Sequence, residues 1–154
     1  MPALFYKTRY IIAVLLSILL LAGSCKKAQE DFTEDILQQY FEQNILNRDF
    51  SVKLATDDTT DITSQFDGYY FRLLKNTNYD GPMTASKNGT VIYNGTWTSN
   101  EDFGKLVINI TQPNTPPEFV FLNRAWRFTE KAIPVMKLAP YGSSTPLVLH
   151  MERH

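Results

Sequence analysis

Apolar and polar residues alternate along most of the chain after Arg48, and this period of two most limits what the chain can fold into. Successive side chains of a strand point to opposite faces of a sheet, so the alternation is typical of strands with one buried face. We therefore expect short, half-buried strands from this point to the C-terminus. The apolar positions that carry the pattern are Phe50, Val52 and Leu54; Tyr69, Phe71 and Leu73; Val91, Tyr93 and Trp97; Leu106, Ile108 and Ile110; Trp126 and Phe128; residues 133–139; and Leu147, Leu149 and Met151.

Clusters of turn-forming residues separate these segments, at residues 56–61, 76–82, 88–89, 100–104, 113–117 and 140–145. The pair Asn88-Gly89 is the strongest turn signal. A type I′ hairpin needs positive φ at both central positions, and Asn and Gly tolerate that conformation best. The pair Asn94-Gly95 lies inside an aromatic run, where it predicts a bulge that bends the strand.

Residues 31–46 are the one segment with helical periodicity. Asp31 and Glu34 match a capping box, and the segment contains no Gly or Pro. Its polar face is acidic and lacks the basic residues that favour an anionic lipid surface. We expect its apolar stripe to pack against the rest of the domain or to plug one end of it. The stripe consists of Phe32, Ile36, Leu37, Tyr40, Phe41 and Ile45.

The order of these elements predicts a mainly β fold. About eight short strands at regular spacing, with no helix between them, favour an antiparallel meander that closes into an up-and-down β-barrel. A β-sandwich is the alternative. We expect residues 31–154 to form a single domain, with the helix at 31–46 ahead of the barrel.

The N-terminal segment is typical of an export signal. Lys7 and Arg9 precede an apolar run over residues 11–22, which is shorter than the ~20 residues that a membrane-spanning helix needs. The run ends in Ala-Gly-Ser-Cys at residues 22–25, and this pattern resembles the lipobox of bacterial lipoproteins. In that family the Cys is acylated and becomes the first residue after cleavage, and more than one acyl chain makes a stable anchor.

We therefore expect residues 1–24 to be a lipoprotein signal peptide and residues 25–30 a linker that carries lipid on Cys25. The lipid anchor predicts a membrane partner and places the protein in the cell envelope, at the outer membrane, on its periplasmic face or at the cell surface. A secreted protein cleaved near Ser24, with an incidental thiol, is the alternative.

Short aromatic motifs in a fixed order carry a second resemblance. They are FDGYYF at 66–71, NGTV at 88–91, GTWT at 95–98, KLVI at 105–108, AWRF at 125–128 and LVLHMER at 147–153. Together they resemble the lipocalin-like lipoproteins of Bacteroidota over residues 49–153, which implies a calycin-type barrel beneath a lipid anchor. The chain departs from classical lipocalins in its Pro-rich linker at 113–117 and in lacking Gly-x-Trp on the first barrel strand.

Catalytic and nucleic-acid functions find little support in the composition. Lys and Arg number 15 against 16 Asp and Glu, so no excess of positive charge favours a nucleic acid. The two histidines, His150 and His154, lie within the last five residues. The Asp-rich stretch at 57–61 lacks the Gly and terminal Glu of an EF-hand loop and favours a hairpin turn. We expect no enzyme activity, cofactor or metal.

Six aromatic residues on the expected inward faces are the candidate ligand-binding residues: Tyr69, Phe71, Tyr93, Trp97, Trp126 and Phe128. The interior of an eight-stranded barrel is either filled by side chains or just wide enough for one small ligand. Two functions follow. In the first, an anchored barrel binds a small hydrophobic ligand among these residues. In the second, the barrel is solid, and the protein is a non-enzymatic interaction or structural protein of the outer-membrane surface.

Overall fold

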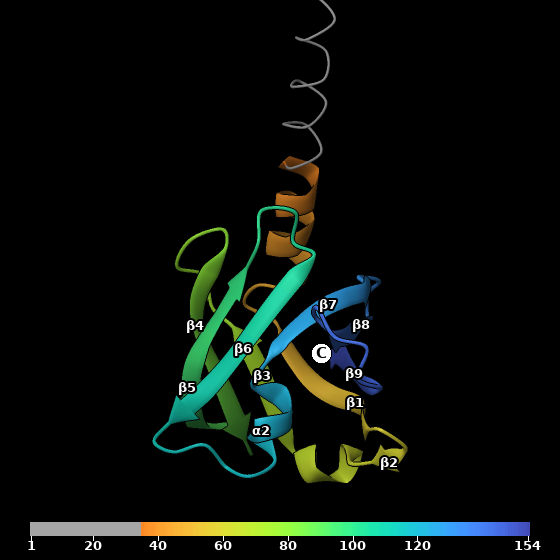
Figure 1. Cartoon of the computed structure of the whole chain (residues 1–154). Helices are drawn as coiled ribbons and strands as arrows, with labels where there is room; N and C mark the ends of the chain where they lie inside the picture. The colour runs from red at the N-terminus through yellow and green to blue at the C-terminus, as the bar shows by residue number, and fades with distance from the viewer. Residues whose placement is uncertain (1–34) are drawn as a thin grey trace, which may run out of the picture. The chain divides into compact units, whose positions relative to one another are not determined.

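Eight antiparallel strands close into a barrel in the computed structural model, which describes residues 35–154 (Figure 1). Each barrel strand pairs with the next along the chain, and the last strand pairs with the first from Phe50–Arg153 to Asp57–Leu147. This closing ladder confirms the predicted up-and-down barrel, and the alternative of a β-sandwich is wrong. The strands are β1 (Asp49–Asp57), β3 (Tyr69–Leu73), β4 (Asp80–Lys87), β5 (Thr90–Ser99), β6 (Lys105–Gln112), β7 (Ala125–Glu130), β8 (Val135–Pro140) and β9 (Leu147–Arg153).

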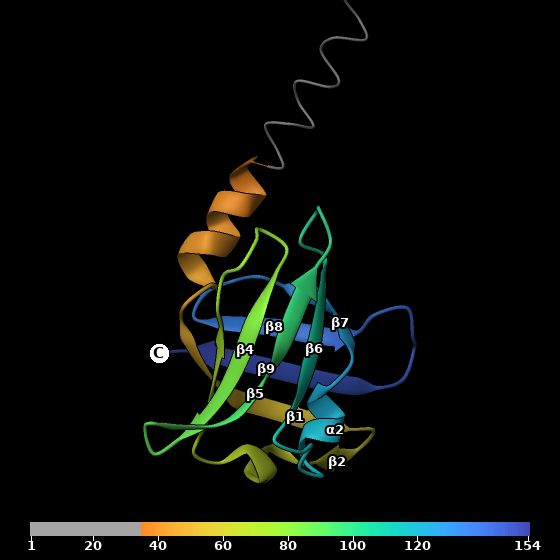
Figure 2. The same cartoon turned by 90° about the vertical axis from the view of Figure 1, so that its left-hand side faces the viewer.

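The core of the barrel comes from the apolar phase of the alternation, as the sequence predicts, except where the register shifts: in β1 Ala55 is buried in place of Leu54, and in β5 Val91 is exposed. In β3 the exposed Tyr70 and Arg72 alternate with the buried Tyr69, Phe71 and Leu73. Figure 2 shows β4, β5 and β6 crossing in front of β1, β8 and β9, which is the arrangement that strongly tilted barrel strands produce. All of these strands lie in one compact unit, Leu37–His154.

A short hairpin completes the barrel wall where β1 and β3 diverge. The two strands pair only through the first two residues of β1. Farther along, the predicted turn at 56–61 forms a hairpin, in which the two-residue strand β2 (Thr60–Asp61) folds back on β1 and is followed by the 3-10 helix η1 (Thr63–Phe66). The amide of Ala55 donates to Thr63 Oγ1 at 2.9 Å. The hairpin segment therefore bonds to the far end of β1, over Ala55, Thr56 and Asp57, which β3 does not reach.

Both Asn-Gly pairs have the predicted roles. Asn88 and Gly89 connect β4 to β5 with φ of 53° and 76°, so both central positions are left-handed, as in a type I′ hairpin. The register of β5 against β6 shifts between Asn94 and Gly95, which confirms the bulge. A Cβ on Gly95 would lie 2.0 Å from the carbonyl oxygen of Asn109, so the two backbones approach closely only because this residue is Gly.

The start of β4 corrects the sequence prediction of a turn over residues 76–82. That prediction is wrong for the second half of the segment, where β4 has already begun. Leu74 N donates to Pro82 O at 2.8 Å, but Pro82 has no N–H with which to return the bond. The carbonyl of Leu74 accepts a hydrogen bond from Trp97 Nε1 instead, at 2.7 Å. A Cβ on Gly81 would lie 1.9 Å from that same carbonyl oxygen, so Gly81 leaves room for the contact.

A one-turn helix that the sequence did not predict, α2 (Phe119–Leu122), enters one end of the barrel. Its first amide, that of Phe119, bonds to Pro116 O at 2.9 Å. Just after the helix, the side chain of Asn123 accepts from Ile110 N at 2.7 Å and donates to Ile110 O at 2.9 Å, which attaches the segment to β6. Phe119 and Leu122 are completely buried. Four residues are too few to show a helical period, so the sequence carried no signal for α2.

The helix over residues 35–44 leads into the opposite end of the barrel (Figures 1 and 2). Phe41 is buried there with its ring centroid 4.7 Å from that of Phe103, and Ile45, just beyond the helix, is also buried. The predicted plug is therefore confirmed for these residues. The proposed capping box involves residues 31–34, which lie outside the described residues. None of the described helices is long and apolar enough to cross a membrane.

Candidate functional site

The structure places all six predicted ligand-binding residues in or against the core of the barrel. They come from three strands, with Tyr69 and Phe71 on β3, Tyr93 and Trp97 on β5, and Trp126 and Phe128 on β7. Four of them are buried, and Tyr93 and Phe128 are partly buried against the core. The alternation therefore predicted correctly that these six side chains face the interior. Contact with a ligand depends in addition on whether the interior is open or filled.

The ring of Phe119 occupies the space between three of these aromatic residues. Its centroid lies 5.1 Å from Tyr93, 5.2 Å from Tyr69 and 5.6 Å from Phe71, with steeply inclined ring planes. Such edge-to-face arrangements are favourable beyond the area they bury. A short helix of the chain itself thus fills the region in which an apolar ligand would have to contact these rings.

The polar groups of the interior aromatic residues are also bonded within the protein. Trp126 Nε1 donates to Leu122 O at 2.9 Å, so one Trp is tied to α2, and the indole N–H of Trp97 is used in the contact described above. The Tyr69 hydroxyl lies 3.4 Å from a carboxylate oxygen of Glu118. Burial, reinforced by the negative charge of Glu118, raises the pKa of Tyr69. These groups stabilise the packed interior.

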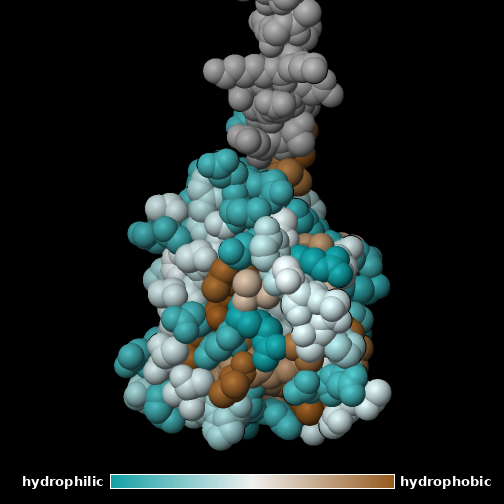
Figure 3. Space-filling view, viewed as in Figure 1, coloured by the Kyte–Doolittle hydropathy of each residue, from teal (hydrophilic) through white to brown (hydrophobic). Residues whose placement is uncertain are grey.

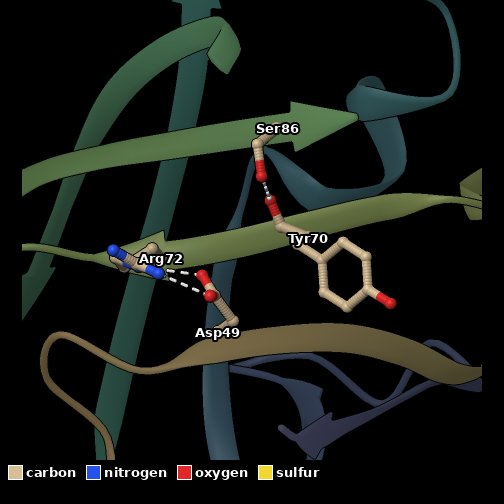
Figure 4. A network of polar contacts seen from close by, with 4 residues as sticks. All are labelled: Asp49, Tyr70, Arg72 and Ser86. Carbon is tan, nitrogen blue, oxygen red and sulfur yellow. Dashed lines mark hydrogen bonds and ion pairs between the residues drawn. The ribbon is translucent and has the colours of Figure 1, made fainter. Parts of the chain in front are cut away.

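The outer face of the barrel carries a hollow of about 280 Å³ over β1, β3, β4 and β5, with both polar and apolar residues in its lining. At its centre, Arg72 Nε donates to Asp49 Oδ1 at 2.8 Å, and a second guanidinium nitrogen contacts Asp49 Oδ2, so the pair is bidentate (Figure 4). These hydrogen bonds raise the pKa of Arg72. The hollow is lined by Asp49, Arg72, Leu74, Thr84, Ser86, Gly89 and Val91.

An exposed aromatic residue lies next to the ion pair on the same face of β3. Tyr70 and Arg72 are two residues apart, so both side chains project outward (Figure 4). Tyr70 is 38% exposed, and its ring centroid lies 5.2 Å from that of His154. Ser86 Oγ donates to Tyr70 O at 3.3 Å, and the next residue across the sheet is Val91, which is 51% exposed. An aromatic and an apolar side chain thus flank a row that is otherwise polar.

A second hollow, of about 560 Å³, continues along the outer face of β4 and β5. Asp80 and Thr98 are paired across these strands there, as are Pro82 and Thr96. Asn76, in the loop before β4, donates to Asp80 Oδ1 at 3.0 Å. Trp97 is the one residue of the predicted six that borders either hollow. The hollow is lined by Lys75, Asn76, Asp80, Gly81, Pro82, Gly95, Thr96, Trp97 and Thr98.

Comparison of the chain with protein-family models, with curated proteins and with solved structures finds no match. The barrel architecture by itself hosts many unrelated functions. The function therefore has to follow from the chemistry of the site.

Hydrophobic surface also gathers around α2, on the face shown in Figure 3. Val120 of this helix is 61% exposed, in contrast to its buried neighbours. The guanidinium of Arg124 lies over the rings of Phe121 and Trp126, at 5.3 and 5.6 Å from their centroids. The exposed apolar area here is small and surrounded by polar residues, as on ordinary protein surfaces.

The two histidines lie on the outside of the barrel, and neither forms a catalytic triad with the described residues. Burial and, to a lesser extent, the charge of Lys137 lower the pKa of His150. His154 Nε2 lies 2.8 Å from Ser51 Oγ, a contact between residues far apart in the sequence that the sequence did not predict. Activation of a serine needs a third group that orients the imidazole, and among residues 35–154 no side chain bonds the other ring nitrogen. The same residues hold no group of three or more His, Cys, Asp or Glu suited to a metal ion.

The sequence did not predict the outer-face site, because its candidate residues all lay in the buried phase of the strands. One usable signal was present, since Tyr70 is an aromatic residue in the polar phase of β3. The pairing of Asp49 with Arg72 had no comparable signal, because it depends on the register of β1 against β3.

Proposed function

We propose that this protein is a non-enzymatic interaction module of the cell envelope, in which a lipid-anchored barrel with a solid core presents its outer face to an envelope component. The observation that carries the proposal is the position of Phe119, whose ring fills the space between Tyr69, Phe71 and Tyr93. Of the two functions predicted from the sequence, this packing favours the interaction module over the binding of a hydrophobic ligand inside the barrel.

The surface that we assign to this function is the outer face around the Asp49–Arg72 pair. It has two adjoining hollows and an exposed aromatic residue, Tyr70. Val91, which is 51% exposed, lines the smaller hollow at its hairpin end, and the adjacent Ile92 is 40% exposed. Aromatic residues, Arg and exposed apolar side chains are enriched at binding surfaces.

The anchor rests on the sequence around Cys25, which lies outside the described residues. The small residues before Cys25 support cleavage and acylation, and the resemblance to lipocalin-like lipoproteins of Bacteroidota supports an outer-membrane location. Cys25→Ala should move the protein from the membrane fraction to the soluble fraction of its host. A variant protein that remains in the membrane fraction after alkaline washing would show that the anchor is not a lipid on Cys25.

The interaction function is tested by photocrosslinking in living cells. A benzophenone amino acid replaces Val91 in the full chain, and in the control it replaces Tyr141, which is 47% exposed. We expect a crosslinked adduct of defined mass from position 91 and none from position 141. The absence of any adduct from position 91, combined with a small hydrophobic molecule that co-purifies with the full chain in native mass spectrometry, would instead favour the interior-ligand function.

A further inference from the structure

The charges that line the smaller hollow cancel each other, and the larger hollow adds one charge of each sign, Lys75 and Asp80. Asp49 and Arg72 form a bidentate pair, with side chains 35% and 45% exposed, and the other residues that line the smaller hollow are uncharged. An anionic or cationic ligand would have to separate this pair, because each charge already has its partner. The site therefore suits a ligand without net charge that uses hydrogen-bond donors and acceptors together.

Hydroxyl groups follow the ion pair along the outward phase of β4 and β5. Ser86 and Thr84 line the smaller hollow, and Thr96 and Thr98 line the larger one. A hydroxyl both donates and accepts, so this row offers matched partners to a ligand rich in hydroxyl groups. Ser86 and Thr84 form the first part of the row on β4, and Thr96 and Thr98 continue it on β5, where they pair with Pro82 and Asp80. From Ser86 to Asp80 this face extends over ~20 Å, at ~3.4 Å per residue, and so has the shape of a strip.

The exposed ring of Tyr70 adds an apolar surface beside the ion pair. Tyrosine combines an apolar face with a polar edge, and its conformational freedom is small for its contact area. A pyranose ring has a matching character, since its C–H groups form an apolar face and its hydroxyls lie around the rim. The carboxylate and the guanidinium can then bond to neighbouring hydroxyls, one as acceptor and the other as donor.

We infer that this face binds a neutral oligosaccharide. Tyr70 stacks against one sugar unit, Asp49 and Arg72 bond to its neighbouring hydroxyls, and later units follow the Ser and Thr strip. The inference rests on the proposed function. It specifies the partner of the interaction module as a glycan of the cell envelope or its surroundings.

The test measures the binding of neutral tetrasaccharides to the full chain by isothermal titration calorimetry. The probes are maltotetraose, laminaritetraose and mannotetraose, and the detergent is a non-glycosidic amine oxide so that it does not compete. We expect at least one probe to bind, with little change in affinity when the salt concentration rises, because no charge is neutralised on binding. Tyr70→Ala and Arg72→Gln should each weaken binding by about tenfold or more.

The matched controls come from another part of the outer surface. Tyr141→Ala removes a tyrosine of similar exposure, and Lys137→Gln breaks the Lys137–Glu130 ion pair, which has a nitrogen–oxygen distance of 2.7 Å and is also exposed. Both should change the affinity by less than about twofold. Ser86→Ala is a second, milder site variant, and thermal melting checks that every variant folds.

Three results would overturn the inference. No binding of any probe would exclude this class of ligand. Binding only of dextran sulfate, a polyanion tested alongside the three probes, that disappears at high salt would also exclude it. Binding that survives Tyr70→Ala, Arg72→Gln and Ser86→Ala in folded proteins would exclude this face. The crosslinking experiment separates the inference from the proposed function. A protein adduct from position 91 without any sugar binding would support the interaction module and refute the glycan as its partner. The absence of both the adduct and sugar binding would refute both proposals.

Discussion

Replacing Phe119 by Ala should remove about 3–5 kcal/mol from the free energy of unfolding. The side chain is 0% exposed, and burial of a Phe ring by itself contributes about 1.5–3 kcal/mol. The edge-to-face contacts with Tyr69 and Tyr93 add about 0.5–1.5 kcal/mol each, so burial and ring contacts together account for the expected loss. Typical domains have a free energy of unfolding of about 5–15 kcal/mol, so this loss is a large part of the total.

The measurement is urea-induced unfolding, followed by the fluorescence of the two buried Trp residues. Val120→Ala is the matched control because it changes the adjacent residue of α2, which is 61% exposed, and it should cost less than about 0.5 kcal/mol. We also expect toluene to stabilise the Phe119→Ala variant and not the parent protein, because the new cavity is lined by aromatic rings. A loss below about 1 kcal/mol would refute the packing of Phe119 inside the barrel and, with it, the argument for a solid core.

Three further outcomes follow from particular contacts. Gly95→Ala should cost about 2–3 kcal/mol in thermal or urea unfolding, because its Cβ would lie 2.0 Å from Asn109 O, and a normal melting curve would refute the close approach of β5 and β6. Arg72→Ala should cost less than about 1 kcal/mol, because the Asp49–Arg72 pair is exposed, and a larger loss would mean that the pair supports the fold. The pKa of His150 is lowered in the folded protein, so the unfolded chain binds the proton more readily and stability should fall as the pH drops below about 6.5. His150→Gln should reduce this dependence between about pH 7.5 and pH 5.5, and an unchanged slope would assign it to other groups.

The elements that the sequence predicted best are those with a strong local signal. The alternation located seven of the eight barrel strands, and Asn88-Gly89 located a hairpin whose two positive φ angles depend only on its own residues. The alternation did not locate β4, because Gly81 and Pro82 at its start are typical of turns. Within β4, Trp97 of the neighbouring strand gives Leu74 O the hydrogen bond that Pro82 cannot donate, and Gly81 leaves room for this contact.

The candidate site was less predictable than the fold. The sequence identified the inward aromatic residues, but it could not distinguish a lined cavity from a filled core. That outcome depends on α2, a single turn whose position is fixed by the hydrogen bonds of Asn123 to β6. The outer-face site depends in the same way on strand register, which brings Asp49 opposite Arg72.

The sequence by itself determined which face of most strands is buried, where most of the turns lie and that a helix precedes the barrel. These properties follow from side-chain polarity and local backbone preference, which act over a few residues. Only the tertiary structure decided that the sheet closes through β1 and β9, that Phe119 fills the interior and that Tyr70 lies beside a neutral ion pair on the outer face. These are contacts between residues far apart in the chain, and they form only when the sheet closes in one register and the whole core packs at once.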